Sequence, residues 1–158
     1  MMGNKQKINK PPYKLKLTQK AVKYWYSARK NNKKWLPIYD QTILSQARTF
    51  KKILHNKKVN FIPKQAEDFC FSYIFGYTSI KEARSKWPSL RGHESNRLKE
   101  VYEMFKKAKS GKIVTSKDHR IVQALAMWGV VKGVKIKFLY PKAVKKSWPL
   151  FWDFLNNV

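Results

Sequence analysis

Residues 18–58 read TQKAVKYWYSARKNNKKWLPIYDQTILSQARTFKKILHNKK, and this stretch decides how the rest of the chain is interpreted. It predicts two basic helices, over residues 18–34 and 40–56, because Leu36-Pro37 between them is typical of a helix end. Threonine and aspartate are favoured just before a helix, so Thr18 and Asp40 are the expected N-caps. The fold therefore begins with a basic helical hairpin.

The second of these helices is amphipathic. Steps of four, three and four residues separate the members of an apolar stripe, Ile43, Ala47, Phe50 and Leu54. A second stripe is cationic and holds Arg48, Lys51, Lys52 and His55. Such a helix packs one side against protein and presents the other to a polyanion.

Net charge is the dominant property of the 158-residue chain. Its 35 Lys and Arg against nine Asp and Glu give +26, and residues 1–64 carry 17 of these cations against the single acid Asp40. A compact chain with this excess repels itself unless an anion binds it, and nucleic acid is the usual partner. A Lys-rich solvated surface remains the alternative interpretation. The 43% hydrophobic content provides for a real core.

The sequence after residue 63 predicts a bundle of helices. A helix is expected from Pro63 through FCFSYIF to Gly76, where a buried strand also fits the apolar run, and Cys70 within it is expected to be buried. Ser79 and Glu82 have the spacing of a capping box for a short helix that ends before Pro88. Both segments agree with an all-α body.

Three further helices complete the expected bundle. One spans residues 95–110, with a predicted inner stripe of Leu98, Val101, Tyr102 and Phe105. The next is capped by Thr115 or Ser116 and ends at Gly133, with Val122, Leu125, Ala126 and Gly129 facing inward. Residues 134–140 predict an extended connection or an intermolecular edge, and a last helix begins near Pro149.

The predicted fold class is all-α, with a basic N-terminal arm and a helix-turn-helix-like clamp before a small helical bundle. The expected domain organisation is an extended arm at residues 1–17, a nucleic-acid clamp at 18–63 and the bundle at 64–158. Pro11 and Pro12 keep the arm extended. No apolar run reaches the roughly 18–20 residues that span a bilayer, so no membrane span is expected.

The sequence shows no grouping of residues for catalysis. Its nine acids have ordinary helix roles, one Cys and three scattered His provide no metal-ligand spacing, and phosphate-binding loops are absent. The dipeptides His93-Glu94 and Asp118-His119 each lie at a helix start, where polar residues are expected. We therefore expect no enzyme activity, no metal and no cofactor.

Binding to nucleic acid without sequence reading is the function that the residues favour. Lys outnumbers Arg by 29 to six, and Lys contacts phosphates, whereas Arg is the usual reader of guanine edges. Trp25 and Trp35 are candidates for stacking on bases or for the core. The predicted nucleic-acid-binding residues are Lys14, Lys16, Lys20, Lys23, Arg29, Lys30, Lys33, Lys34, Arg48, Lys51, Lys52, Lys57, Lys58 and Lys64.

The order of parts resembles the major coat proteins of archaeal filamentous viruses of the lipothrixvirus and rudivirus type. The resemblance lies in the basic arm, the two helices around KKWLPIYD, the loop into NFIPK and the helical bundle. It implies a virion protein whose residues 18–58 clamp double-stranded DNA, held in A-form, while residues 64–158 pack against neighbours in a filament. It also implies self-association or a paralogous coat protein as partner.

Three other functions stay open. A ribosomal or other ribonucleoprotein component would use the same basic arm on RNA, which would place the protein in a ribosome or nucleoprotein complex. A small metal-dependent nuclease would need clustered carboxylates. A helix-turn-helix transcription factor would use residues 79–105, although Glu94, Glu100 and Glu103 would repel phosphates.

Overall fold

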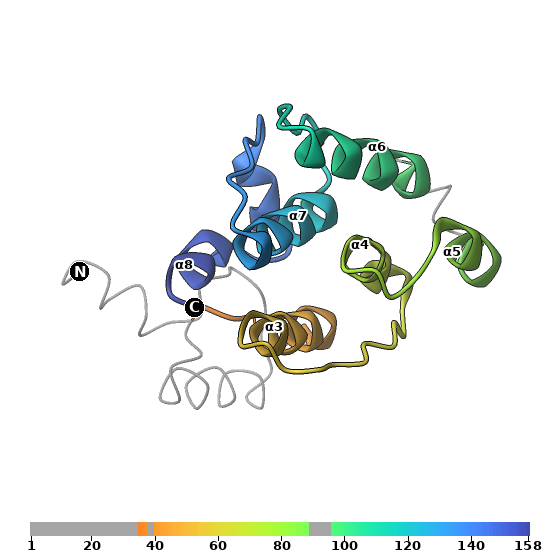
Figure 1. Cartoon of the computed structure of the whole chain (residues 1–158), viewed down its shortest axis with the longest axis horizontal. Helices are drawn as coiled ribbons and strands as arrows, with labels where there is room; N and C mark the ends of the chain where they lie inside the picture. The colour runs from red at the N-terminus through yellow and green to blue at the C-terminus, as the bar shows by residue number, and fades with distance from the viewer. Residues whose placement is uncertain (1–34, 38–39, 89–95) are drawn as a thin grey trace.

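The structure, a computed structural model, describes residues 35–37, 40–88 and 96–158 (Figure 1). The described part is all-α, as predicted, and contains no strand. Its elements, in chain order, are α3 (Gln41–Leu54), the 3₁₀ turn η2 (Ala66–Asp68), α4 (Phe69–Ile74), α5 (Ile80–Lys86), α6 (Arg97–Lys109), α7 (His119–Lys132), the 3₁₀ helix η4 (Pro141–Lys146) and α8 (Phe151–Asn156).

Helix α7 is the centre of the bundle. Every residue from His119 to Gly129 is buried, which requires protein on all sides of the helix. Helices α3, α4 and α6 and the turn η4 pack against it, and Figure 1 shows α7 in the middle of the described elements. The apolar composition of this segment is therefore explained by burial on every face rather than on one stripe.

Helix α3 contributes its apolar stripe to the same core. Ile43 and Phe50 are fully buried, Ala47 is nearly so, and Leu54 packs partly buried at the edge. The Phe50 ring lies 6.0 Å, centroid to centroid, from that of Phe154 in α8. The predicted amphipathic helix is thus confirmed, and its apolar face packs on its own chain.

The segment around α4 follows the sequence prediction closely. The run FCFSYIF is a buried helix rather than a strand, and it ends before Gly76, which adopts a left-handed conformation with φ of 84°. Its start differs from the prediction, because the helical turns begin at Ala66 and not at Pro63. Ser79 and Glu82 form the predicted capping box of α5. Cys70 is buried, as expected.

Helix α6 matches the predicted stripe except at Tyr102, since Leu98 and Val101 are buried and Phe105 packs partly buried against the core. Tyr102 was expected to face inward, but 52% of its surface is exposed, and Met104 and Ala108 are buried instead. Tyrosine is compatible with a water-facing position because its hydroxyl prefers to stay hydrated.

The cap of α7 is another correction. Its N-cap is Asp118, whose side chain accepts a hydrogen bond from the Arg120 amide, and neither Thr115 nor Ser116 caps it. Ser116 instead accepts a hydrogen bond from the Asp118 amide. Sequence alone could not separate Thr115, Ser116 and Asp118, the three capping candidates in TSKD, because each of these residue types is favoured at an N-cap.

The connection after α7 is extended, as predicted, and it pairs within the chain. Phe138 forms an isolated parallel bridge with Val114, with hydrogen bonds of 2.8 Å from the Val114 amide to the Lys137 carbonyl and 2.9 Å from the Leu139 amide to the Val114 carbonyl. The chain then forms η4, which the sequence did not predict, and α8 begins at Phe151, close to the expected Pro149.

Two predicted units lie outside the described residues. They are the arm at residues 1–17 and the first basic helix at residues 18–34. The division into residues 1–17, 18–63 and 64–158 therefore stays a prediction. Residues 35–37 are described, and the Trp35 carbonyl accepts a 2.8 Å hydrogen bond from the buried Trp148 indole, which joins this segment to the end of the chain.

Candidate nucleic-acid interface

The cationic stripe predicted for α3 is exposed in the structure. Arg48, Lys51 and Lys52 are exposed, while Ile43 and Phe50 on the opposite side are fully buried. Successive members of a helical stripe lie about 5–6 Å apart at their Cβ atoms. Helix α3 therefore presents a row of positive charges to solvent.

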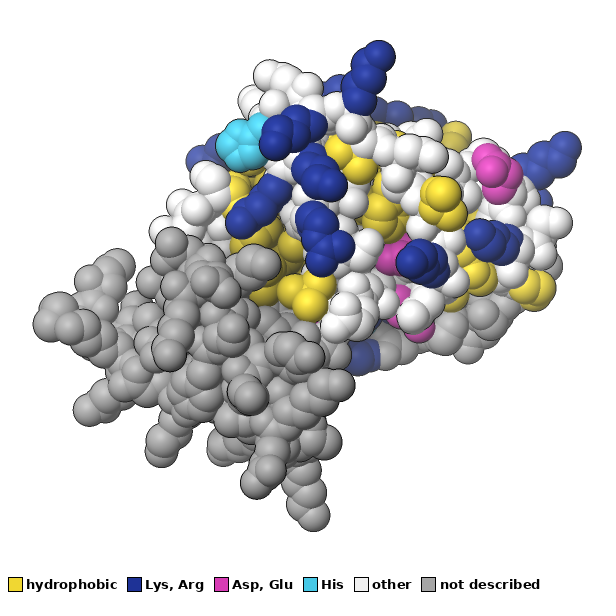
Figure 2. Space-filling view, turned by 90° about the horizontal axis from the view of Figure 1, so that it is seen from below, with side chains coloured by type: hydrophobic (Ala, Val, Ile, Leu, Met, Phe, Trp, Pro, Cys, Tyr) yellow, Lys and Arg dark blue, Asp and Glu magenta, His cyan; other side chains and the backbone are white. Residues whose placement is uncertain are grey.

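The chain after α3 extends this cationic surface. Asn56 adopts a left-handed conformation with φ of 58°, and the Lys57 amide donates a hydrogen bond to the Lys52 carbonyl, so the helix ends in a compact turn. We call the exposed cations of α3 and of the following loop the α3 cationic face. Its members are Arg48, Lys51, Lys52, Lys57, Lys58 and Lys64. Figure 2 shows Lys and Arg side chains gathered on the side of the molecule where α3 lies.

A buried carboxylate fixes the loop beside α3. Asp68 accepts a 3.0 Å hydrogen bond from the Gln46 side chain of α3. Its other oxygen accepts hydrogen bonds from the backbone amides of Lys64, at 3.0 Å, and Gln65, at 3.3 Å. The backbone at Lys64 is therefore held next to α3 by hydrogen bonds that satisfy the buried Asp68 carboxylate.

The α3 cationic face is electrostatically uncompensated within the described chain. None of its six members forms an ion pair with a described residue. Lys51 lies 5.8 Å from the centroid of the Phe154 ring, a weak cation–π contact. Exposed cations that have no carboxylate partner attract an anion from solution, and most strongly an anion with regularly spaced charges.

Six of the fourteen predicted nucleic-acid-binding residues are described, and all six are exposed. The other eight lie outside the described residues: Lys14, Lys16, Lys20, Lys23, Arg29, Lys30, Lys33 and Lys34. Whether they join the same surface therefore stays a prediction.

A buried polar cluster, which the sequence analysis did not single out as functional, lies at the start of α7. Asp118 accepts a 2.7 Å hydrogen bond from the Nε of Arg97, and both side chains are more than nine-tenths buried. Burial alone would raise the pKa of Asp118, but the charge and hydrogen bond of Arg97 dominate and hold it below its ordinary value. In the sequence, the run Asp118-His119-Arg120 marks this cluster, because it places three polar residues at the start of one helix.

His119 in this cluster is held neutral. Burial lowers its pKa to about 4, and the neighbouring charge of Arg120 adds to the effect. Its Nδ1 lies 2.6 Å from the Ser147 hydroxyl oxygen, which also accepts a 2.9 Å hydrogen bond from the Gln123 amide. The cluster joins α7 to α6 and to the segment after η4, and its burial makes it a structural feature of the core.

Acidification should destabilise the fold through His119. The unfolded chain binds a proton near pH 6.5 and the folded chain only near pH 4, so the free energy of unfolding falls as pH decreases through this window, by about 1–3 kcal/mol. Urea unfolding at pH 7.5, 6.5, 5.5 and 4.5 measures it. His119→Asn should flatten this dependence. Equal stability of the wild type at pH 7.5 and 4.5 would contradict the assignment.

The described part of the chain shows no metal-binding cluster, and its one cysteine is buried. In residues 35–37, 40–88 and 96–158, no three His, Cys, Asp or Glu side chains are grouped closely enough to hold a metal ion. Burial raises the pKa of the Cys70 thiol far above its usual range, so this thiol stays protonated. Among the same residues, no helix has the length and apolarity needed to cross a membrane.

Comparison with known proteins gives one family. Residues 89–155 match the family model of EPSP synthase (3-phosphoshikimate 1-carboxyvinyltransferase). The match covers less than half of the chain and includes α6, α7, η4 and most of α8. No curated protein and no solved structure matches.

The family match corrects several predictions from the sequence. It names an enzyme family, so the expectation that the chain has no enzyme activity is wrong. It also contradicts the resemblance to viral coat proteins, the interpretation as a structural packaging protein and the predicted virion location. The α3 cationic face lies outside the matched residues, so the match leaves its partner untested.

Proposed function

We propose that the protein binds the phosphate backbone of nucleic acid through the α3 cationic face. The observation that carries the proposal is the exposure of six cations on and beside α3, none of them paired with a described carboxylate. Double-stranded DNA is the partner expected, and RNA is the alternative.

The positions of the cations support contact with several phosphates. Arg48, Lys51 and Lys52 span about 6 Å of the α3 axis, or about two base-pair levels of a duplex at 3.4 Å each, and the loop after α3 adds three more lysines. Lysine dominates the surface, and its single flexible ammonium group contacts phosphates without reading bases. Binding should therefore be independent of sequence and strongly dependent on salt.

The test is a comparison of two triple variants with equal loss of charge. Replacing Arg48, Lys51 and Lys52 with glutamine should weaken binding to a 30-base-pair duplex roughly 100-fold at 0.1 M salt and reduce the log–log salt slope by about 2.7. The control replaces Lys81, Lys132 and Lys145, which are also exposed but lie on other elements.

Fluorescence anisotropy over a range of salt concentrations measures both affinity and slope. If the two triple variants lose the same affinity, binding depends only on net charge and the proposed face is wrong. Duplexes of two unrelated sequences should bind within about threefold of each other, because phosphate contacts carry no sequence information. An RNA duplex of the same sequence, compared with the DNA duplex, identifies the preferred partner.

The family match supports a second candidate, an enzyme activity of the kind its description names, carried by residues 89–155. The full-length chain, incubated with 3-phosphoshikimate and a carboxyvinyl donor, would then form a carboxyvinyl product detectable by mass spectrometry. A reaction that yields no product above the level without protein would exclude this candidate. This assay is independent of the nucleic-acid measurement, so each candidate can fail separately.

A further inference from the structure

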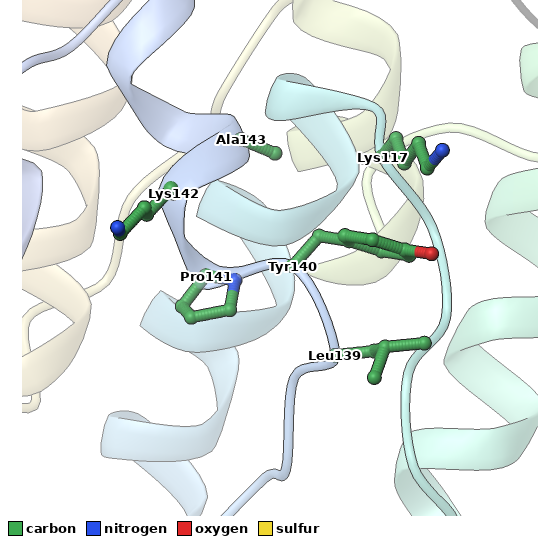
Figure 3. Close-up of a pocket in the computed structure, with 6 residues that line it drawn as sticks. All are labelled: Lys117, Leu139, Tyr140, Pro141, Lys142 and Ala143. Carbon is green, nitrogen blue, oxygen red and sulfur yellow. The ribbon is translucent and has the colours of Figure 1, made fainter.

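A pocket lies where the extended segment after α7 meets η4. Its volume is about 430 Å³, within the usual range for small-molecule sites. Figure 3 shows the residues that line it, which are Lys117, Leu139, Tyr140, Pro141, Lys142 and Ala143. None of them belongs to the α3 cationic face.

The backbone around the pocket is held by hydrogen bonds on two sides. The Leu139 amide donates to the Val114 carbonyl at 2.9 Å, which fixes the extended segment beside the residues leading to Lys117. On the other side, the Trp152 indole of α8 donates to the Pro141 carbonyl at 2.9 Å. The pocket is therefore formed before any ligand binds, which lowers the entropic cost of binding.

The lining combines an apolar surface with the positive charges of Lys117 and Lys142. Leu139 is 49% exposed and Tyr140 is 38% exposed, and Pro141 and Ala143 continue the apolar surface. The Lys117 ammonium lies 4.9 Å from the centroid of the Tyr140 ring. In Figure 3 the Lys117 amine and the Tyr140 hydroxyl point to the same side. Lys117 forms no ion pair with a described residue, and no lining residue is acidic.

We propose that this pocket binds a small organic anion, with a compact apolar body and one carboxylate or phosphate group. The body would cover Leu139 and Pro141, which are otherwise left in contact with water. The anionic group would accept hydrogen bonds from the Lys117 ammonium and the Tyr140 hydroxyl, and hydrogen bonds of this charged kind are stronger than neutral ones. A bare inorganic anion leaves the apolar surface exposed, and a neutral apolar molecule leaves Lys117 unpaired.

The test uses phenyl phosphate and benzoate as probes on the ¹⁵N-labelled full-length chain, at 150 mM salt to weaken binding to other lysines. We expect saturable chemical-shift changes at the amides of Lys117, Leu139, Tyr140 and Ala143. Lys117→Met should weaken binding by about fivefold or more, and Tyr140→Phe by about threefold. The matched control is Lys132→Met, which removes an equal charge from an exposed position outside the pocket and should leave the affinity unchanged.

Four results would overturn the proposal. The first is the absence of saturable shifts at these amides with either probe. The second is an equal response to inorganic phosphate, which would show that the apolar body contributes nothing. The third is an equal response to benzyl alcohol, which would show that the charge contributes nothing. The fourth is an equal loss of affinity in Lys117→Met and Lys132→Met. The relative affinity of the two probes identifies the preferred anionic group.

Discussion

Replacing Asp118 with asparagine should lower the free energy of unfolding by about 3–5 kcal/mol, because it leaves the Arg97 guanidinium buried without its carboxylate. Asparagine is nearly the size of aspartate and also caps helices, so the variant removes the charge and keeps the cap of α7. Urea unfolding at pH 7 measures the effect.

A double variant separates the charge from the packing. Arg97→Met combined with Asp118→Asn should be less destabilised than Asp118→Asn alone, because no uncompensated buried charge remains. Glu103→Gln is the surface control, since the Lys99–Glu103 pair has a 3.9 Å separation and both side chains are at least half exposed. Its cost should be below about 0.5 kcal/mol. If Asp118→Asn costs no more than Glu103→Gln, the buried pair does not stabilise the fold.

Local sequence rules predicted the helices well where one residue type had one role. Asp40 caps α3, and Ser79 and Glu82 form the capping box of α5. The helical spacing of apolar and basic residues in α3 matches its buried and exposed faces. These features depend on neighbours within about one helical turn. Such neighbours are visible in the sequence.

Features that depend on distant contacts were missed. Gln46 of α3 is buried because it donates to Asp68, 22 residues away, and Asp118 is buried because it pairs with Arg97. Tyr102 and Met104 are both compatible with the core of an amphipathic helix, and only the packing of α6 decides between them. The pocket next to Lys117 requires residues 114 and 138 to be paired, and no local pattern specifies that pairing.

The candidate site was partly predictable for the same reason. The exposure of Arg48, Lys51 and Lys52 follows from helical periodicity, since the opposite side of α3 is apolar. The sequence could not reveal that Lys64 is held beside α3, because that position depends on the hydrogen bonds to Asp68.

Replacing Phe50 with alanine should cost about 3–5 kcal/mol of the free energy of unfolding, because the ring is fully buried and packs on Phe154. Phe50→Leu should cost less, since it restores most of the lost volume. Arg48→Ala is the matched control on the same helix, and its exposed position predicts a change within about 0.5 kcal/mol.

The Phe50 variant also tests what the apolar face of α3 packs against. If it packs on its own chain, as the structure shows, the loss in Phe50→Ala is the same at every protein concentration, because no association step is involved. If a neighbouring copy covered this face, the midpoint of thermal unfolding of the wild type would rise with concentration, and Phe50→Ala would abolish that rise. Thermal unfolding at 5 and 100 μM distinguishes the two cases. A fixed α3 matters for the proposed function, since Arg48, Lys51 and Lys52 stay in one row only while Phe50 holds the opposite side of the helix in the core.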